Sequence, residues 1–225
     1  TRLRRYVDRA SIEDELPHAR NAFANAARQL RTVTDSMLDG QAPDAHEFGR
    51  AIDDLVDSMI DNPDALMWVA AMLEDGRDPG SHGVKVALHL VALGRHLGLP
   101  RRELAHLGTI GMLADVGKAR LPQAVLEKPG MLTQSEHNVV KEHVRLGIEA
   151  LRTNMRLALT VEEGIAQHHE RLDGSGYPKG LKGDEIGVYG RMAAIADSFA
   201  ALIAARSYAN ASAPQDALMN LYEWG

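Results

Sequence analysis

The chain has 225 residues, of which 45% are hydrophobic and 4% aromatic, and its formal net charge is −6. This length buries a core, and the scarcity of aromatic residues favours close-packed helices over a β-sandwich. The acidic balance argues against polymeric nucleic acid as a partner, and the absence of cysteine excludes disulfides, iron–sulfur clusters and Cys-ligated zinc. No run is apolar and long enough to cross a bilayer, and no secretion signal opens the chain. Any metal must be held by histidine and carboxylate groups.

The first part of the chain is expected to be helical after a basic entry segment, residues 1–10. Apolar residues up to Met37 follow a 4-3-4-3 spacing, which is the seam of a bundle or coiled-coil helix. Pro17 conflicts with a start at Ser11, so the regular helix is expected to begin at Pro17 and to end at Gly40. Internal bundle packing is the favoured interpretation of this seam. A homodimer or a signal-transmitting contact through this helix is the alternative.

Capping and breaking signals predict the remaining helices. Asp44 and Glu47 form a capping-box pattern, and Pro63 opens a further short helix. The turn-rich loop 74–81 then predicts a boundary between an N-terminal helical region, residues 1–75, and a second domain, residues 76–225. Strand-like alternation is missing, so the predicted fold class is all-α. Helices are expected in the second domain at about 81–96, 101–116, 133–152, 158–168 and 188–206.

Histidine and aspartate residues stand near the predicted helix ends of the second domain. Imidazole and carboxylate ligands suit Fe, Mn, Zn, Co or Ni, and two neighbouring cations stabilise a phosphoryl transition state from both sides. Adjacent histidines converge on one centre only where a helix ends, because each residue turns about 100°. Lys118 lies one helical turn after Asp115, where an ammonium group suits a scissile phosphate. The candidate metal-site residues are His82, Asp115, His143, His168, His169 and Asp197.

Each of these residues can also be interpreted as a structural residue without a metal. A lone histidine is more often a core or surface residue than a ligand, and Asp115 alone could cap a helix. Asp197 is different, because it lies inside the apolar stretch MAAIADSFAAL and needs a partner for its charge, which a metal would supply.

The glycine-rich loop 168–183 directly follows the histidine pair. Its glycines allow tight turns and a close approach of backbone to a ligand. Arg171, Lys179 and Lys182 are suited to phosphate, and Tyr177 to stacking on a base. A plain surface turn is the alternative, but the fusion to the histidine pair favours a binding loop.

The sequence HHERLDGSGYPKGLKGDEI, with LADVGKARLPQAVLEKPGMLTQSE upstream and RMAAIADSFAAL downstream, resembles the HD-GYP family over roughly residues 78–210. The resemblance implies an HD-type helical bundle and a bacterial cytoplasmic phosphodiesterase that opens cyclic di-GMP to pGpG and GMP. It implies two divalent metals, with Fe or Mn favoured, bound by the six residues named above. Asp115 and Lys118 would be catalytic. The implied substrate-binding residues are Arg171, Gly176, Tyr177, Pro178, Lys179, Lys182 and Arg206.

Two departures from the family pattern leave the activity open. The His-Asp pair reads Ala114-Asp115, and a methyl group cannot bind metal, so one ion is expected to be weakly held or absent. The chain also ends earlier than the family's last helices, so a C-terminal truncation is expected. The first hypothesis is an attenuated cyclic di-GMP phosphodiesterase. The second is an inactive module that binds cyclic di-GMP or a GGDEF-domain protein, and the third is hydrolysis of another phosphodiester.

Overall fold

A computed structural model describes residues 4–72, 79–204 and 212–224, with only the backbone described at residues 79–81 and 224. The described residues are helical and form no strand, apart from one isolated bridge between Asp173 and Lys182. The all-α prediction is therefore confirmed. The chain divides into two compact units, Thr1–Met112 and Leu113–Gly225. The predicted boundary near residue 75 lies outside the described residues, so the division into 1–75 and 76–225 stays a prediction.

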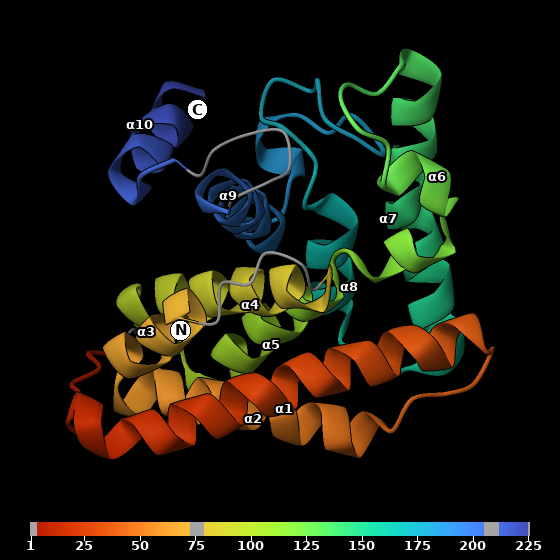
Figure 1. Cartoon of the computed structure of the whole chain (residues 1–225). Helices are drawn as coiled ribbons and strands as arrows, with labels where there is room; N and C mark the ends of the chain where they lie inside the picture. Colours follow the sequence, from red (N-terminus) through yellow and green to blue (C-terminus); the bar gives the residue numbers. More distant parts are fainter. Residues whose placement is uncertain (1–3, 73–78, 205–211, 225) are drawn as a thin grey trace. The chain divides into compact units, whose positions relative to one another are not determined.

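The first unit is built from long helices (Figure 1). Ser11 caps the first helix by accepting a hydrogen bond from the Asp14 N–H at 3.1 Å, and Pro17 lies inside the helix. The predicted start at Pro17 is wrong, because a capped first turn and a buried face outweigh the one backbone hydrogen bond that proline cannot donate. The helices are α1 (Ile12–Leu38), α2 (Ala45–Asp61), α3 (Pro63–Met72), α4 (Pro79–His96) and α5 (Arg101–Leu113).

One side of the core of the first unit lies along α1. The apolar seam of this helix, including Phe23, Leu30 and Val33, is buried where α1 packs against α2, α3 and α4. This is the internal packing that the seam predicted. Asp44 caps α2 as expected, since its carboxylate accepts from the N–H groups of His46 and Glu47.

The second unit has shorter and more irregular elements. α7 begins with a complete capping box, in which Thr133 and Glu136 each accept a hydrogen bond from the backbone N–H of the other. α5 ends at Leu113, three residues before the predicted end. The elements are η1 (Val116–Arg120), α6 (Gln123–Leu126), α7 (Gln134–Asn154), α8 (Leu159–Gln167), η2 (Gly183–Glu185), α9 (Val188–Ile203) and α10 (Pro214–Trp224).

Packing in the second unit runs through α7, which contacts η1, α6 and α8, while α9 contacts α8 and α10. Buried apolar side chains such as Leu151, Ile165 and Met192 fill the space between these helices. This arrangement brings the start of η1, the middle of α7 and the end of α8 together. Among the described helices, none has the length and apolar character that a membrane crossing requires.

Candidate metal centre

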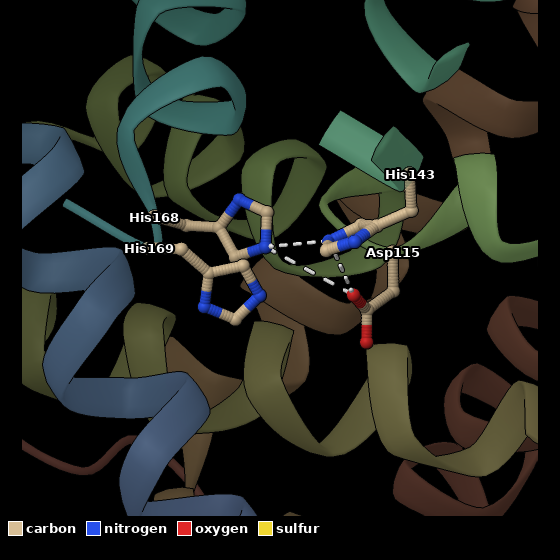
Figure 2. A group of neighbouring side chains, drawn as sticks. All are labelled: Asp115, His143, His168 and His169. Atoms are coloured by element: carbon tan, nitrogen blue, oxygen red, sulfur yellow. Dashed lines mark hydrogen bonds and ion pairs between the residues drawn. The ribbon is translucent and has the colours of Figure 1, made fainter. Parts of the chain in front are cut away.

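Four predicted ligands from three different segments meet in the second unit. Figure 2 shows Asp115, His143, His168 and His169 pointing toward one another. One ligand atom from each lies within 4.8 Å of the others. The structure therefore brings together residues that lie up to 54 positions apart in the sequence.

The histidine pair stands where α8 ends. Gln167 is the last helical residue, His168 is the C-cap, and the two ring centroids are 4.0 Å apart. The His143 ring lies 5.5 Å from the ring of His168 and 5.1 Å from that of His169. The chain leaves its helical path at the pair, so both rings face one centre, as the sequence predicted.

Asp115 reaches the cluster because η1 lies directly on α7. A Cβ atom on Gly117 would fall 2.0 Å from the His143 carbonyl oxygen and 2.5 Å from the Gly147 nitrogen. Only glycine permits this approach, since the contacting atoms belong to a helix backbone that cannot yield. Gly117 thus places the start of η1, and with it Asp115, beside His143.

The hydrogen bonds of two imidazoles fix which nitrogen faces the centre. His143 Nδ1 lies 2.7 Å from the Val140 carbonyl oxygen, and His168 Nδ1 lies 2.7 Å from that of Ile165. A carbonyl only accepts, so each Nδ1 carries the proton and each Nε2 presents a lone pair. Burial lowers the pKa of His143 to about 4, so this imidazole is neutral at pH 7.

The lone pairs converge at ligand spacing. The two Nε2 atoms lie 3.4 Å apart, and the Asp115 Oδ1 atom lies 3.3 Å from that of His143 and 3.9 Å from that of His168. Ligands at about 2.1 Å from one cation are roughly 3.0–3.4 Å from each other. Two of the three distances fall in this range and the third is longer. Three electron-rich atoms this close together repel unless a cation lies among them. The donor set therefore fits a divalent metal ion of the kind that imidazole and carboxylate ligands prefer.

A second carboxylate adjoins the cluster. Asp197 on α9 places a carboxylate oxygen within 4.8 Å of one of Asp115. Burial beside His168 lowers the pKa of His169 to about 2, so that imidazole is also neutral and free to act as a ligand. His82 belongs to α4 in the first unit, and its role as a ligand stays a prediction.

Lys118 lies against the other side of Asp115. Its Nζ atom is 2.6 Å from Asp115 Oδ2, while Oδ1 faces the two imidazoles. The side chain of Lys118 is 38% exposed. An ammonium group held at the edge of the cluster remains accessible to a ligand from solvent. The side chain of Ala114, just before Asp115, is buried and offers no donor.

The loop after the histidine pair is folded around Glu170, which sequence reasoning had given no role. Glu170 is 3% exposed and accepts hydrogen bonds from the backbone N–H groups of Lys179, at 2.7 Å, and Leu181, at 2.9 Å. In the sequence Glu170 is simply an acidic residue beside a glycine-rich loop. Many exposed acidic residues stand in the same kind of context, so nothing marked this one as buried. Glu170 holds the loop closed.

Tyr177 packs against the centre. Its ring stacks on His169 with centroids 4.7 Å apart, and its N–H donates to the His169 carbonyl oxygen at 3.1 Å. Gly176 permits this fold, because a Cβ there would lie 2.4 Å from the Arg171 nitrogen. Burial raises the pKa of Tyr177, so the phenol stays protonated. The stacking of Tyr177 on a nucleotide base stays a prediction. The structure adds a contact between Tyr177 and His169, which is a candidate metal ligand.

The other predicted binding residues are spread along the loop. Arg171, Pro178 and Lys179 are exposed, and the Lys182 side chain lies across Gly174. Arg206 lies outside the described residues. The candidate metal ligands of the second unit thus lie close together, whereas the predicted phosphate-binding side chains of Arg171 and Lys179 are exposed to solvent.

Comparison with known proteins adds relatives to this geometry. A family model described as HD domain matches residues 69–223. A cyclic di-GMP phosphodiesterase of Pseudomonas aeruginosa is 30% identical over 216 residues, which cover 96% of this chain and 52% of that protein. A 3'3'-cGAMP-specific phosphodiesterase of Vibrio cholerae is 44% identical over 133 residues, which cover 59% of this chain and 26% of that protein. The chain thus spans about half the length of these curated relatives, or less.

The fold also has a solved counterpart. An HDG"Y"P protein from Bdellovibrio bacteriovorus matches with a TM-score of 0.67 at 21% identity, over 94% of this chain and 64% of that one. At this identity the match establishes a shared fold.

Proposed function

The chain belongs to the HD-domain family, and on that premise we propose that it is a metal-dependent phosphodiesterase that opens cyclic di-GMP to pGpG and GMP. The HD-GYP resemblance predicted from the motif is confirmed by the matches, among them a relative named as a cyclic di-GMP phosphodiesterase. The observation that carries the proposal is the convergence of the His143 and His168 Nε2 atoms with Asp115 Oδ1.

The residues of the second unit divide into ligands and a charge stabiliser. Asp115, His143, His168 and His169 would hold a metal, with Asp197 beside them for a second. A bound divalent cation supplies Lewis-acid polarisation of a phosphoryl oxygen and acidification of water. The HD-GYP resemblance favours Fe or Mn, and imidazole and carboxylate oxygen ligands suit both, as they suit Zn, Co and Ni. Neutral imidazoles need not release a proton before they bind the ion, because burial already keeps His143 unprotonated.

Lys118 has a separate role. Its ammonium group already contacts Asp115 Oδ2 and is partly exposed, so it can donate to a phosphate oxygen at the same edge of the cluster. Positive charge at this place favours a transition state in which negative charge develops on the phosphoryl oxygens.

Ala114 supports a second candidate, an inactive module that binds cyclic di-GMP or a signalling protein such as one with a GGDEF domain. The family's histidine is missing at this position, so one ligand is absent from the set. The similarity to a 3'3'-cGAMP-specific relative supports testing that dinucleotide as a further substrate.

The deciding experiment measures bound metal and hydrolysis in the unmodified chain, Ala114→His and Ala114→Leu. The side chain of Ala114 is buried, at 4% exposure, so Ala114→Leu controls for added bulk without a donor, and circular dichroism checks the fold. Both cyclic di-GMP and 3'3'-cGAMP are assayed after loading with Mn²⁺ or Fe²⁺. Turnover by the unmodified chain supports the enzyme. Absence of turnover, with activity gained only in Ala114→His, supports the inactive module and rejects the enzyme.

A further inference from the structure

A groove of about 650 Å³ runs along α7 in the second unit, between this helix, α8 and the loop residues 177–179. Its volume lies within the range of small-ligand sites. Val144 and Ile148 form a buried apolar floor, and charged side chains line its rim. The groove is separate from the four-residue cluster described above, and Tyr177 belongs to the walls of both.

The cations of the groove fall into two classes. Arg145 is bonded to Glu142 and Glu149, each at 2.7 Å, and Arg152 is bonded to Glu162. These arginines are neutralised by their own neighbours. A phosphate would have to compete with these carboxylates for the guanidinium groups.

Lys141 and Lys179 belong to the other class. Within residues 4–72, 79–204 and 212–224, neither forms an ion pair with a carboxylate. Lys141 Nζ lies 5.1 Å from the centroid of the Tyr177 ring, and Lys179 follows that tyrosine by two residues. The lining cations without a carboxylate partner among the described residues are thus Lys141, which lies at Tyr177, and Lys179, which is close to Tyr177 in the sequence; this part of the groove is called its Tyr177 end.

That end adjoins the candidate metal centre. Tyr177 stacks on His169 at 4.7 Å and lies 6.4 Å from the His143 ring. One aromatic ring therefore separates the Lys141 ammonium group from the histidines. A ligand with two negative charges a short distance apart can place one at the cluster and the other at the lysines.

We propose that Lys141 and Lys179 form a second phosphate subsite, which holds the phosphodiester that is not being cleaved. The identity of the ligand rests on the proposed function, because a cyclic dinucleotide carries two phosphodiesters in one ring. An ammonium group is a compact charge without the fixed fork of arginine, so two lysines accept a phosphate in several orientations. Contact with phosphate alone makes this subsite indifferent to the bases.

The test is equilibrium binding of cyclic di-GMP and 3'3'-cGAMP to the chain in the presence of EDTA, which prevents turnover. Lys141→Met and Lys179→Met remove charge and retain length. Each is expected to raise the Kd for both dinucleotides by about fivefold, an effect that shrinks at high salt because the site is partly exposed. Lys141→Arg restores most of the affinity. Arg152→Met is the matched control, since it removes a paired cation from the same groove, and its Kd stays within about twofold of the unmodified value.

Kinetics of the metal-loaded chain supply a second readout. The lysine variants are expected to raise KM by the same factor and to leave kcat within about twofold. Failure of the unmodified chain to hydrolyse either dinucleotide rejects the proposed activity and leaves the Kd comparison valid.

Three results overturn the subsite. They are lysine variants that bind like Arg152→Met, a loss confined to one of the two dinucleotides, and no binding of either dinucleotide to the unmodified chain, whether metal-free or metal-loaded.

Discussion

Glu170 offers the sharpest test of how the loop supports the metal centre. Its buried carboxylate accepts hydrogen bonds from two backbone N–H groups. In Glu170→Gln, one of these N–H groups would face the amide NH₂ group, which cannot accept a hydrogen bond. A buried N–H without an acceptor costs about 1–3 kcal/mol, and bonds to a charged group contribute about 1.5–3 kcal/mol. We therefore expect the free energy of unfolding to fall by about 3 kcal/mol. For a chain of this size the midpoint Tm then falls by roughly 6–12 °C.

The matched control is Glu185→Gln in η2, directly after this loop. Glu185 also accepts a backbone hydrogen bond, from the Lys182 N–H at 2.8 Å, but its side chain is exposed and water can replace the bond. Thermal unfolding followed by circular dichroism compares the two variants, and we expect less than about 1 kcal/mol for the control. Because Tyr177 packs on His169 through this loop, Glu170→Gln should also weaken Mn²⁺ binding about tenfold. Equal shifts in Tm for the two variants would refute the argument.

Three further changes test other contacts. Gly117→Ala should destabilise the chain strongly, because its Cβ would meet the His143 carbonyl oxygen at 2.0 Å, whereas Gly49→Ala has open space in a helix and should stabilise it by about 0.5–1 kcal/mol in urea titrations. Thr133→Ala removes the capping box with Glu136 and should cost about 1 kcal/mol in the same titrations. For His143, the unfolded chain gains a proton below pH 6.5 and the folded chain only near pH 4, so acid lowers the free energy of unfolding of the metal-free protein across this interval. That loss, up to roughly 3 kcal/mol, should be absent in His143→Gln.

Local capping signals predicted two helix starts correctly. The caps at Asp44 and Thr133 use side chains within three residues of the bonds they satisfy, and the structure has both. The helix start predicted at Pro17 was wrong, because burial of apolar side chains along the whole of α1 outweighs the one hydrogen bond that proline cannot donate. The end of α5 at Leu113 carries no proline or glycine signal, and the turn that follows depends on Gly117 meeting α7, a contact between distant segments.

The sequence identified candidate ligands that the structure brings together, but it did not identify the residues that support them. Asp115 and the His168–His169 pair were recognised as candidate ligands from residue type, spacing and family pattern. Glu170 and Lys141 were missed, because the role of each is defined by a partner elsewhere in the fold. Lys141 meets Tyr177 across 36 residues of sequence, and no local pattern on α7 marks that contact.

The orientation of the imidazoles has a consequence for loading the centre with metal. His143 and His168 are each anchored by a carbonyl three residues earlier in their own segment, so each ring is held before any ion arrives. Freezing a side chain on binding costs up to about 1–2 kcal/mol of rotamer entropy, and these two rings have largely lost that freedom during folding. Capture and release of an ion can then proceed with little rearrangement of the helices. The exchange rate should depend on access for water and ions rather than on refolding.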